Sequence, residues 1–150
     1  MCFRWPKVPH KDIAESERTI TEKVFKTPDA TGKIGRQFYF AIIRKDDPHQ
    51  KVIGAVGINF LDPAPSLGYG IHPDCWGKGF AGEAARAVVN AWWQLDRMGS
   101  DKAGKERLYA ACNQANIASV KVLLRAGFRK VKEISIEGDT VAVFDQTRPC

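Results

Sequence analysis

The segment from Gly68 to Trp93, GYGIHPDCWGKGFAGEAARAVVNAWW, combines a short strand pattern, a glycine-bearing loop and a long helix pattern without interruption. A loop that enters a helix in this way leaves backbone N–H groups without helical partners, and the helix dipole adds about half a positive charge at the same point. The segment therefore predicts a phosphate site at Gly77 to Gly82. The alternative is an ordinary glycine turn into a helix.

Two common phosphate-binding patterns do not fit this loop. Gly77-Lys78-Gly79 lacks the third glycine of the dinucleotide fingerprint, and Lys78 is not followed by Ser or Thr as in a Walker loop. A nucleotide-binding domain that uses the loop in another way stays open as an alternative at this point.

Length and composition indicate one globular domain over residues 1–150. No apolar run approaches the roughly 20 residues of a membrane span, and the N-terminus lacks the apolar core of a signal peptide; we therefore expect a cytoplasmic protein, with the nucleus as the alternative. The dispersed cysteines and histidines predict neither a disulfide framework nor a metal site. The net charge of +6 favours an acidic ligand, whereas the scattered lysines and arginines argue against nucleic acid.

Periodicity and capping residues predict three helices. Asp12 and Glu15 form a capping-box-like start for the first, over residues 12–26. The second follows the glycine loop, and its core-facing stripe consists of Ala81, Ala84, Ala85, Val88, Trp92 and Leu95. The third lies within residues 116–128, with one face made of Ile117, Val120 and Leu124 and with Gly127 as its left-handed stop.

Runs of β-branched and aromatic residues predict six strands, at residues 37–45, 51–61, 66–72, 106–113, 128–136 and 139–146. The first two and the last two read as antiparallel hairpins, the last one turning at Glu137-Gly138. In the strand at residues 66–72, Leu67, Tyr69 and Ile71 alternate with Gly68, Gly70 and His72, so one face is nearly bare. One interpretation is that a ligand binds along this strand, and the other is a glycine-tolerant bulge with no bound ligand.

Two motifs that bracket one strand resemble those of the GNAT superfamily of acetyl-CoA-dependent N-acyltransferases. In HPDCWGKGFAGEA, Gly79 and Ala81 match the loop pattern of that family, and Trp76 stands in its first position. NIASVKVLLRAGF is similar to the second motif of the branch that includes the ribosomal-protein N-terminal acetyltransferases, at Asn116, Ser119, Gly127 and Phe128. The resemblance covers about Phe38 to Asp145.

This resemblance implies a single α/β (α+β) domain with a mixed, splayed sheet flanked by helices. Acetyl-CoA, the cosubstrate, would enter between the third and fourth strands, with its diphosphate on the loop amides and its pantetheine arm along the strand edge. No metal is implied, and for Asn116 a plain helix N-cap is the alternative role. The implied cofactor-binding residues are Gly70, Ile71, Gly77, Lys78, Gly79, Phe80, Ala81, Gly82 and Asn116.

The implied reaction is direct attack of a primary amine on the thioester in a ternary complex. Many relatives protonate the sulfur with a tyrosine where this chain has Leu123, which leaves Ser119 as the candidate donor, against a structural role in the first helical turn. His72 is the candidate base, against an ordinary surface histidine, and a main-chain N–H near Ile71 or His72 would hold the oxyanion. A weak base favours an acceptor of low pKa, a peptide N-terminal α-amine or a small amine.

The N-terminus departs from the family, whose members open with a further strand and helix. Only about eleven residues precede the first predicted helix, so this opening unit is expected to be absent and residues 37–45 to form an unprotected sheet edge. Three alternatives follow: a shortened gene product, a homodimer that covers the edge, and a noncatalytic module that binds acyl-CoA or serves as an interaction domain.

Overall fold

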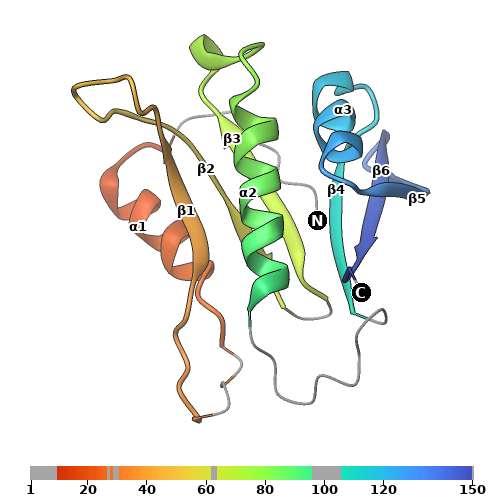
Figure 1. Cartoon of the computed structure of the whole chain (residues 1–150), viewed down its shortest axis with the longest axis horizontal. Helices are drawn as coiled ribbons and strands as arrows, with labels where there is room; N and C mark the ends of the chain where they lie inside the picture. Colours follow the sequence, from red (N-terminus) through yellow and green to blue (C-terminus); the bar gives the residue numbers. More distant parts are fainter. Residues whose placement is uncertain (1–9, 27, 29–30, 62–63, 96–105, 150) are drawn as a thin grey trace.

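A computed structural model of the chain describes residues 10–26, 28, 31–61, 64–95 and 106–149 (Figure 1). The prediction that an opening strand and helix are absent concerns residues 1–9, which lie outside the described residues. The elements in chain order are α1 (Ile13–Glu22), β1 (Phe38–Ile43), β2 (Val52–Phe60), β3 (Ser66–Ile71), the 3₁₀ turn η1 (Pro73–Cys75), α2 (Phe80–Gln94), β4 (Arg107–Asn113), α3 (Ile117–Arg125), β5 (Arg129–Ile136) and β6 (Asp139–Thr147).

The strands form one mixed sheet in the order β1-β2-β3-β4-β6-β5, in which β3 and β4 are parallel and the other neighbours antiparallel. The pairing between β3 and β4 is limited to Ser66 opposite Tyr109, next to the 2.9 Å bond from Tyr109 N to the Pro65 carbonyl. Beyond this point the two strands run apart (Figure 1). The predicted α/β (α+β) fold with a splayed mixed sheet is therefore confirmed, and β1 is an edge strand, as expected.

Helix α2 packs against β2 and β3, and most of its predicted core stripe is correct. Ala85, Val88 and Trp92 are buried, and Trp92 meets the Phe38 ring edge-on at 5.4 Å, so Trp92 serves packing as predicted. Leu95 is wrong as a core residue: it is 40% exposed, because the helix ends at Gln94 and Leu95 is its extended C-cap.

The apolar face named for α3 is not the face that the structure buries. Ile117 and Leu124 are 58% and 51% exposed, whereas Leu123 is 1% exposed and belongs to the central core. The short helix contacts α2, β4 and β5, and these neighbours select the buried face. The predicted stop at Gly127 is correct, since this glycine has a φ of +90°.

Helix α1 begins as predicted but ends earlier than residue 26. The Asp12 carboxylate accepts the Glu15 N–H at 2.8 Å, and the Glu15 carboxylate accepts the Lys11 N–H at 2.8 Å. After Glu22 the chain turns so that Phe25 N donates to the Arg36 carbonyl at 2.7 Å and the Phe25 ring enters the core. The long-range bridge and the burial of Phe25 replace the last predicted helical turn.

The three C-terminal strands of the sheet order, β4, β6 and β5, are tied together by a buried carboxylate. Asp145 on β6 is 1% exposed. Arg107 on β4 and Arg129 on β5 each donate to one of its carboxylate oxygens, the Arg129 Nε bond being 2.7 Å long. This network lies on the far side of β4 from the β3–β4 gap and keeps one wall of the gap in place.

Candidate functional site

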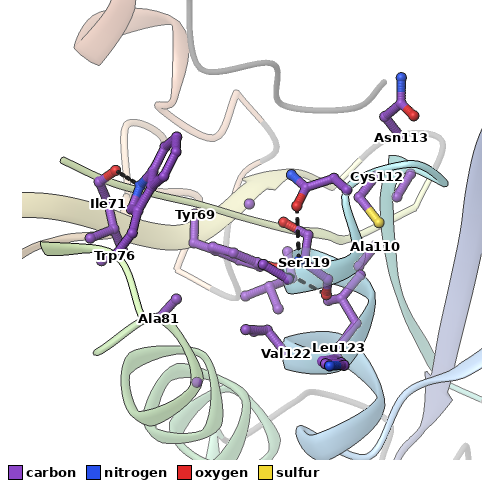
Figure 2. A pocket seen from close by; sticks show the side chains of 18 of the residues that line it. Tyr69, Ile71, Trp76, Ala81, Ala110, Cys112, Asn113, Ser119, Val122 and Leu123 are labelled. Carbon is purple, nitrogen blue, oxygen red and sulfur yellow. Dashed lines mark hydrogen bonds between the residues drawn. The ribbon is translucent and has the colours of Figure 1, made fainter. Parts of the chain in front are cut away.

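A cavity of about 750 Å³ occupies the gap between β3 and β4. Its walls come from β3, the loop before α2, the first turn of α2, β4, α3 and the β5–β6 turn. Figure 2 shows side chains from β3, β4 and α3 converging on this space. Its size is that of a site for a small molecule or cofactor.

At the start of α2 the main chain faces this cavity with no side chain on its glycine residues to cover it. Gly77 and Gly79 have φ values of +72° and +82°, and a Cβ at either position would meet nothing within 4 Å. Gly79 is the helix N-cap and supplies no side-chain cap; the first turn closes with the Glu83 N–H on the Gly79 carbonyl at 3.1 Å. The N–H groups of residues 80–82 are therefore left for an anionic ligand.

The open edge of β3 presents the main chain of Tyr69 and Ile71. The His72 N–H donates to the Ile53 carbonyl of β2 at 2.7 Å, so residues 68, 70 and 72 turn their main-chain groups toward β2. The main-chain N–H and C=O groups of residues 67, 69 and 71 consequently face the gap. The Ile71 carbonyl accepts the indole N–H of Trp76 at 2.7 Å, although the Trp76 side chain is largely exposed (Figure 2).

The α3 side of the cavity carries two hydroxyl groups. Asn116 is the N-cap of α3, and its Oδ1 accepts the Ser119 N–H at 3.1 Å. The Tyr69 hydroxyl reaches from β3 to the Ser119 carbonyl at 3.3 Å, so Tyr69 and Ser119 lie together (Figure 2). From the sequence, Tyr69 was named only as one of the alternating residues of this strand and its hydroxyl was given no role, because nothing local indicates that it reaches α3.

The structure brings the predicted cofactor-binding residues together, except Lys78. Gly70, Ile71, Gly77, Gly79, Phe80, Ala81, Gly82 and Asn116 all line the cavity, as does Ser119. Lys78 is exposed and donates from Nζ to the Asp74 carbonyl at 3.0 Å, and it is not part of the cavity wall. Gly70 contributes only its Cα surface, because its N–H and C=O belong to the ladder with β2.

His72 lies outside the cavity wall. Its exposed ring caps the 3₁₀ turn by accepting the Asp74 N–H at 3.4 Å, and its Nδ1 is 3.6 Å from the Asp74 carboxylate. Its own N–H is used in the bond to Ile53, so it is not available for an oxyanion. The structure thus gives His72 a local role at the surface and leaves the Ile71 N–H facing the gap.

The cavity passes through the sheet. Cys112 pairs with Ala142, and both belong to the core beneath α2 and α3. Asn113 pairs with Val141, and side chains alternate along β6, so Val141 and Asp139 lie on the opposite face of the sheet. Because Cys112, Val141 and Asp139 all line the same cavity, its wall includes residues from both faces of the sheet.

Within the described ranges, no group of three or more His, Cys, Asp and Glu side chains is arranged to hold a metal ion. In the same part of the chain, no helix has both the length and the apolar character needed to cross a membrane.

Comparisons with known proteins agree with the motifs and the fold. The family model described as "Acetyltransferase (GNAT) domain" matches residues 1–129. The uncharacterized N-acetyltransferase p20 of Bacillus licheniformis is 30% identical over 125 residues, which is 81% of this chain and 62% of that protein.

Solved structures show the same fold at lower identity. The ribosomal-protein-S5-alanine acetyltransferase of Vibrio fischeri has a TM-score of 0.60 at 23% identity, over 74% of this chain and 61% of that chain. A putative GnaT-family acetyltransferase of Bordetella pertussis has a TM-score of 0.60 at 18% identity, over 73% of this chain and 65% of that chain. The chain thus spans less than two thirds of the length of these relatives.

Proposed function

Because the chain belongs to the GNAT acetyltransferase family, we propose that residues 1–150 form one domain that transfers an acetyl group from acetyl-CoA to a primary amine. The observation that carries the proposal is the position of the uncapped α2 N-terminus at one end of the gap between β3 and β4. The uncapped N-terminus of α2 can bind a diphosphate, and the gap between β3 and β4 can hold an extended arm that ends in a thioester.

In this proposal the diphosphate of acetyl-CoA accepts hydrogen bonds from the N–H groups of residues 80–82. The pantetheine arm then follows the open edge of β3, where the main chain of Tyr69 and Ile71 faces the gap. Trp76 must release the Ile71 carbonyl if a pantetheine amide is to use it. Asn116 has its Oδ1 engaged in the helix cap, so its NH₂ group is left to contact the cosubstrate.

The reaction begins with attack of a neutral amine on the thioester carbonyl carbon. The Ile71 N–H, which faces the gap, is placed to stabilise the oxyanion, and collapse of the tetrahedral intermediate breaks the C–S bond. The departing thiolate takes a proton from Ser119, with the adjacent Tyr69 hydroxyl as the alternative donor. The positively charged nitrogen of the tetrahedral intermediate loses its extra proton to solvent, and the donor hydroxyl regains a proton from solvent, so that the products are the neutral amide and the free CoA thiol.

The acceptor approaches from the face of the sheet opposite α2 and α3. Glu137 in the β5–β6 turn and Asp139 at the start of β6 line the cavity and favour a cationic amine before it loses its proton. No histidine lines the described cavity wall, which favours acceptors that are partly neutral without help from a base. A peptide N-terminal α-amine or a small amine of low pKa meets this requirement.

A panel of acceptors tests the proposal. We expect acceptor-dependent release of free CoA thiol, faster at pH 7 with peptides whose N-terminus is free than with N-acetylated peptides that offer only lysine. About a tenth of α-amines of pKa near 8 are neutral at this pH, against fewer than about one in a thousand lysines. Preference for lysine would contradict the proposed acceptor, while tight acetyl-CoA binding with no turnover on any amine would favour the noncatalytic acyl-CoA-binding module.

Substitutions distinguish the two candidate catalytic residues. Ser119→Ala is expected to lower kcat about 10²-fold, the effect typical of losing a positioned proton donor. The helix cap survives in this variant, because it uses the Ser119 N–H and not the hydroxyl. His72→Ala is expected to leave kcat unchanged, since the ring lies outside the cavity wall. Initial rates of thiol release measure both effects. If both variants keep the rate of the original chain, positioning alone drives the reaction.

Two further expectations stay predictions. A homodimer would pair along β1, whose outer edge has no partner strand among the described elements and whose Phe40 and Ile43 are 46% and 45% exposed. A cytoplasmic location would bring the domain to its cosubstrate.

A further inference from the structure

Helix α3 turns two cationic side chains into the cavity. Lys121 and Arg125 line it together with Ala118 and Val122. These positions lie three, four and seven residues apart, so they form one stripe of the helix. Helices α2 and α3 contact each other and lie side by side (Figure 1), which puts this stripe on the same face of the sheet as the N-terminus of α2.

These two cations have no anionic partner in the described part of the chain. Neither Lys121 nor Arg125 forms an ion pair or a side-chain hydrogen bond with any described residue. Two carboxylates line the cavity: Glu137 lies in the β5–β6 turn, and Asp139 begins β6 on the opposite face of the sheet. The buried carboxylate of Asp145 is already held by two arginines.

The main-chain amides at the start of α2 account for one anionic group, the diphosphate. CoA carries a second one, the 3′-phosphate monoester on its ribose, with a charge near −2 at neutral pH. We propose, on the basis of the function proposed above, that Lys121 and Arg125 form the subsite for this 3′-phosphate. The site thereby distinguishes CoA from its analogue without this group, dephospho-CoA.

The two side chains suit this ligand in different ways. The planar guanidinium of Arg125 donates two parallel hydrogen bonds to phosphate oxygens, and the Lys121 ammonium adds a compact charge on a flexible stem. Both are solvent-exposed, so the subsite is an open rim and its attraction is screened by salt. The diphosphate and pantetheine contacts do not involve either side chain.

Calorimetric titration with CoA and dephospho-CoA tests the subsite. The unmodified chain is expected to bind CoA at least about tenfold more tightly than dephospho-CoA at low salt, and this preference should fall as salt is added. In the double variant Lys121→Ala/Arg125→Ala the preference is expected to disappear, while the dissociation constant for dephospho-CoA stays within about threefold of its original value.

A double variant with the same change in net charge serves as the control. Arg18→Ala/Lys132→Ala removes one arginine and one lysine that are exposed and lie outside the cavity wall. This control should keep the full preference for CoA. Adenosine 3′,5′-bisphosphate and ADP, used as competitors, should show the same preference in the original chain and lose it only in the Lys121/Arg125 variant.

Three results would overturn the subsite: equal binding of CoA and dephospho-CoA by the original chain, a preference that survives in the Lys121/Arg125 variant, or an equal loss of preference in the control. Each of these leaves the proposed acetyl transfer standing, because both ligands still bind. Absence of binding by either ligand would instead overturn the proposed function, on which the subsite rests.

Discussion

Asp145→Ala is expected to lower the free energy of unfolding by about 3 kcal/mol, because the variant loses two hydrogen bonds between charged groups at about 1.5 kcal/mol each. The carboxylate is 1% exposed and is shared by Arg107 of β4 and Arg129 of β5. Its loss leaves two guanidinium groups without their acceptor and removes the tie across β4, β6 and β5. Urea titration followed by circular dichroism measures the change, and the midpoint should fall without a change in slope.

An exposed ion pair provides the matched control. Asp46 also accepts two hydrogen bonds from an arginine, Arg44, but its side chain is 71% exposed. Asp46→Ala should therefore cost clearly less stability than Asp145→Ala. Equal losses in the two variants would mean that the Asp145 network does not act as a buried tie.

The same network gives a pH dependence of known sign. The hydrogen bond from Arg129 is the largest influence and lowers the pKa of Asp145, with Arg107 acting in the same direction and burial opposing both. The stabilisation is therefore present above the ordinary aspartate pKa of about 3.9 and is lost as the pH falls through the lower pKa of the folded state. The difference in stability between the original chain and Asp145→Ala should shrink over that acidic range.

Gly79→Val is expected to raise the dissociation constant for CoA about 10²-fold, which corresponds to the loss of one or two hydrogen bonds to a charged group. Gly79 has a φ of +82° and is the N-cap from which the free N–H groups of α2 project. A β-branched residue disfavours this backbone conformation and adds bulk beside the amides. Calorimetric titration with CoA measures the effect.

Gly32 offers a control that carries the same local strain elsewhere. Its φ is +80°, and a Cβ there would meet nothing within 4 Å, as at Gly79. Gly32→Val should lose a similar amount of stability and keep its affinity for CoA. Similar affinities for CoA in the two valine variants would show that the diphosphate does not bind at the start of α2.

Several elements could be predicted because their causes lie within a few residues. The Asp12 cap, the αL stop at Gly127 and the hairpin turn at Glu137-Gly138, with φ values of +50° and +85°, all follow from local side chains and glycine. The end of α1 could not be predicted, because Phe25 leaves the helix to pair with Arg36 and to enter the core. The buried face of α3 differs from the prediction for a similar reason, since neighbouring elements select it.

The features of the candidate site likewise include some that local sequence predicts and some that it does not. The glycine loop, the helix start and Asn116 were predicted from motifs, whereas the exclusion of Lys78 from the cavity wall was not. For His72 the sequence left a catalytic base and a surface histidine open, and the structure places the ring at the surface. The meeting of Tyr69 with Ser119 and the direction of Lys121 and Arg125 also had no local signal. These features depend on how far β3 and β4 separate.

The sequence by itself determined that a glycine loop opens a helix after a short strand, because main-chain freedom, capping and alternation act between close neighbours along the chain. The tertiary structure alone decided that β3 and β4 part beyond Ser66 and Tyr109 and enclose a cavity with a cationic side and an acidic side. β3 pairs along its length with β2, and β4 pairs along its length with β6. The space between β3 and β4 is therefore left for a ligand.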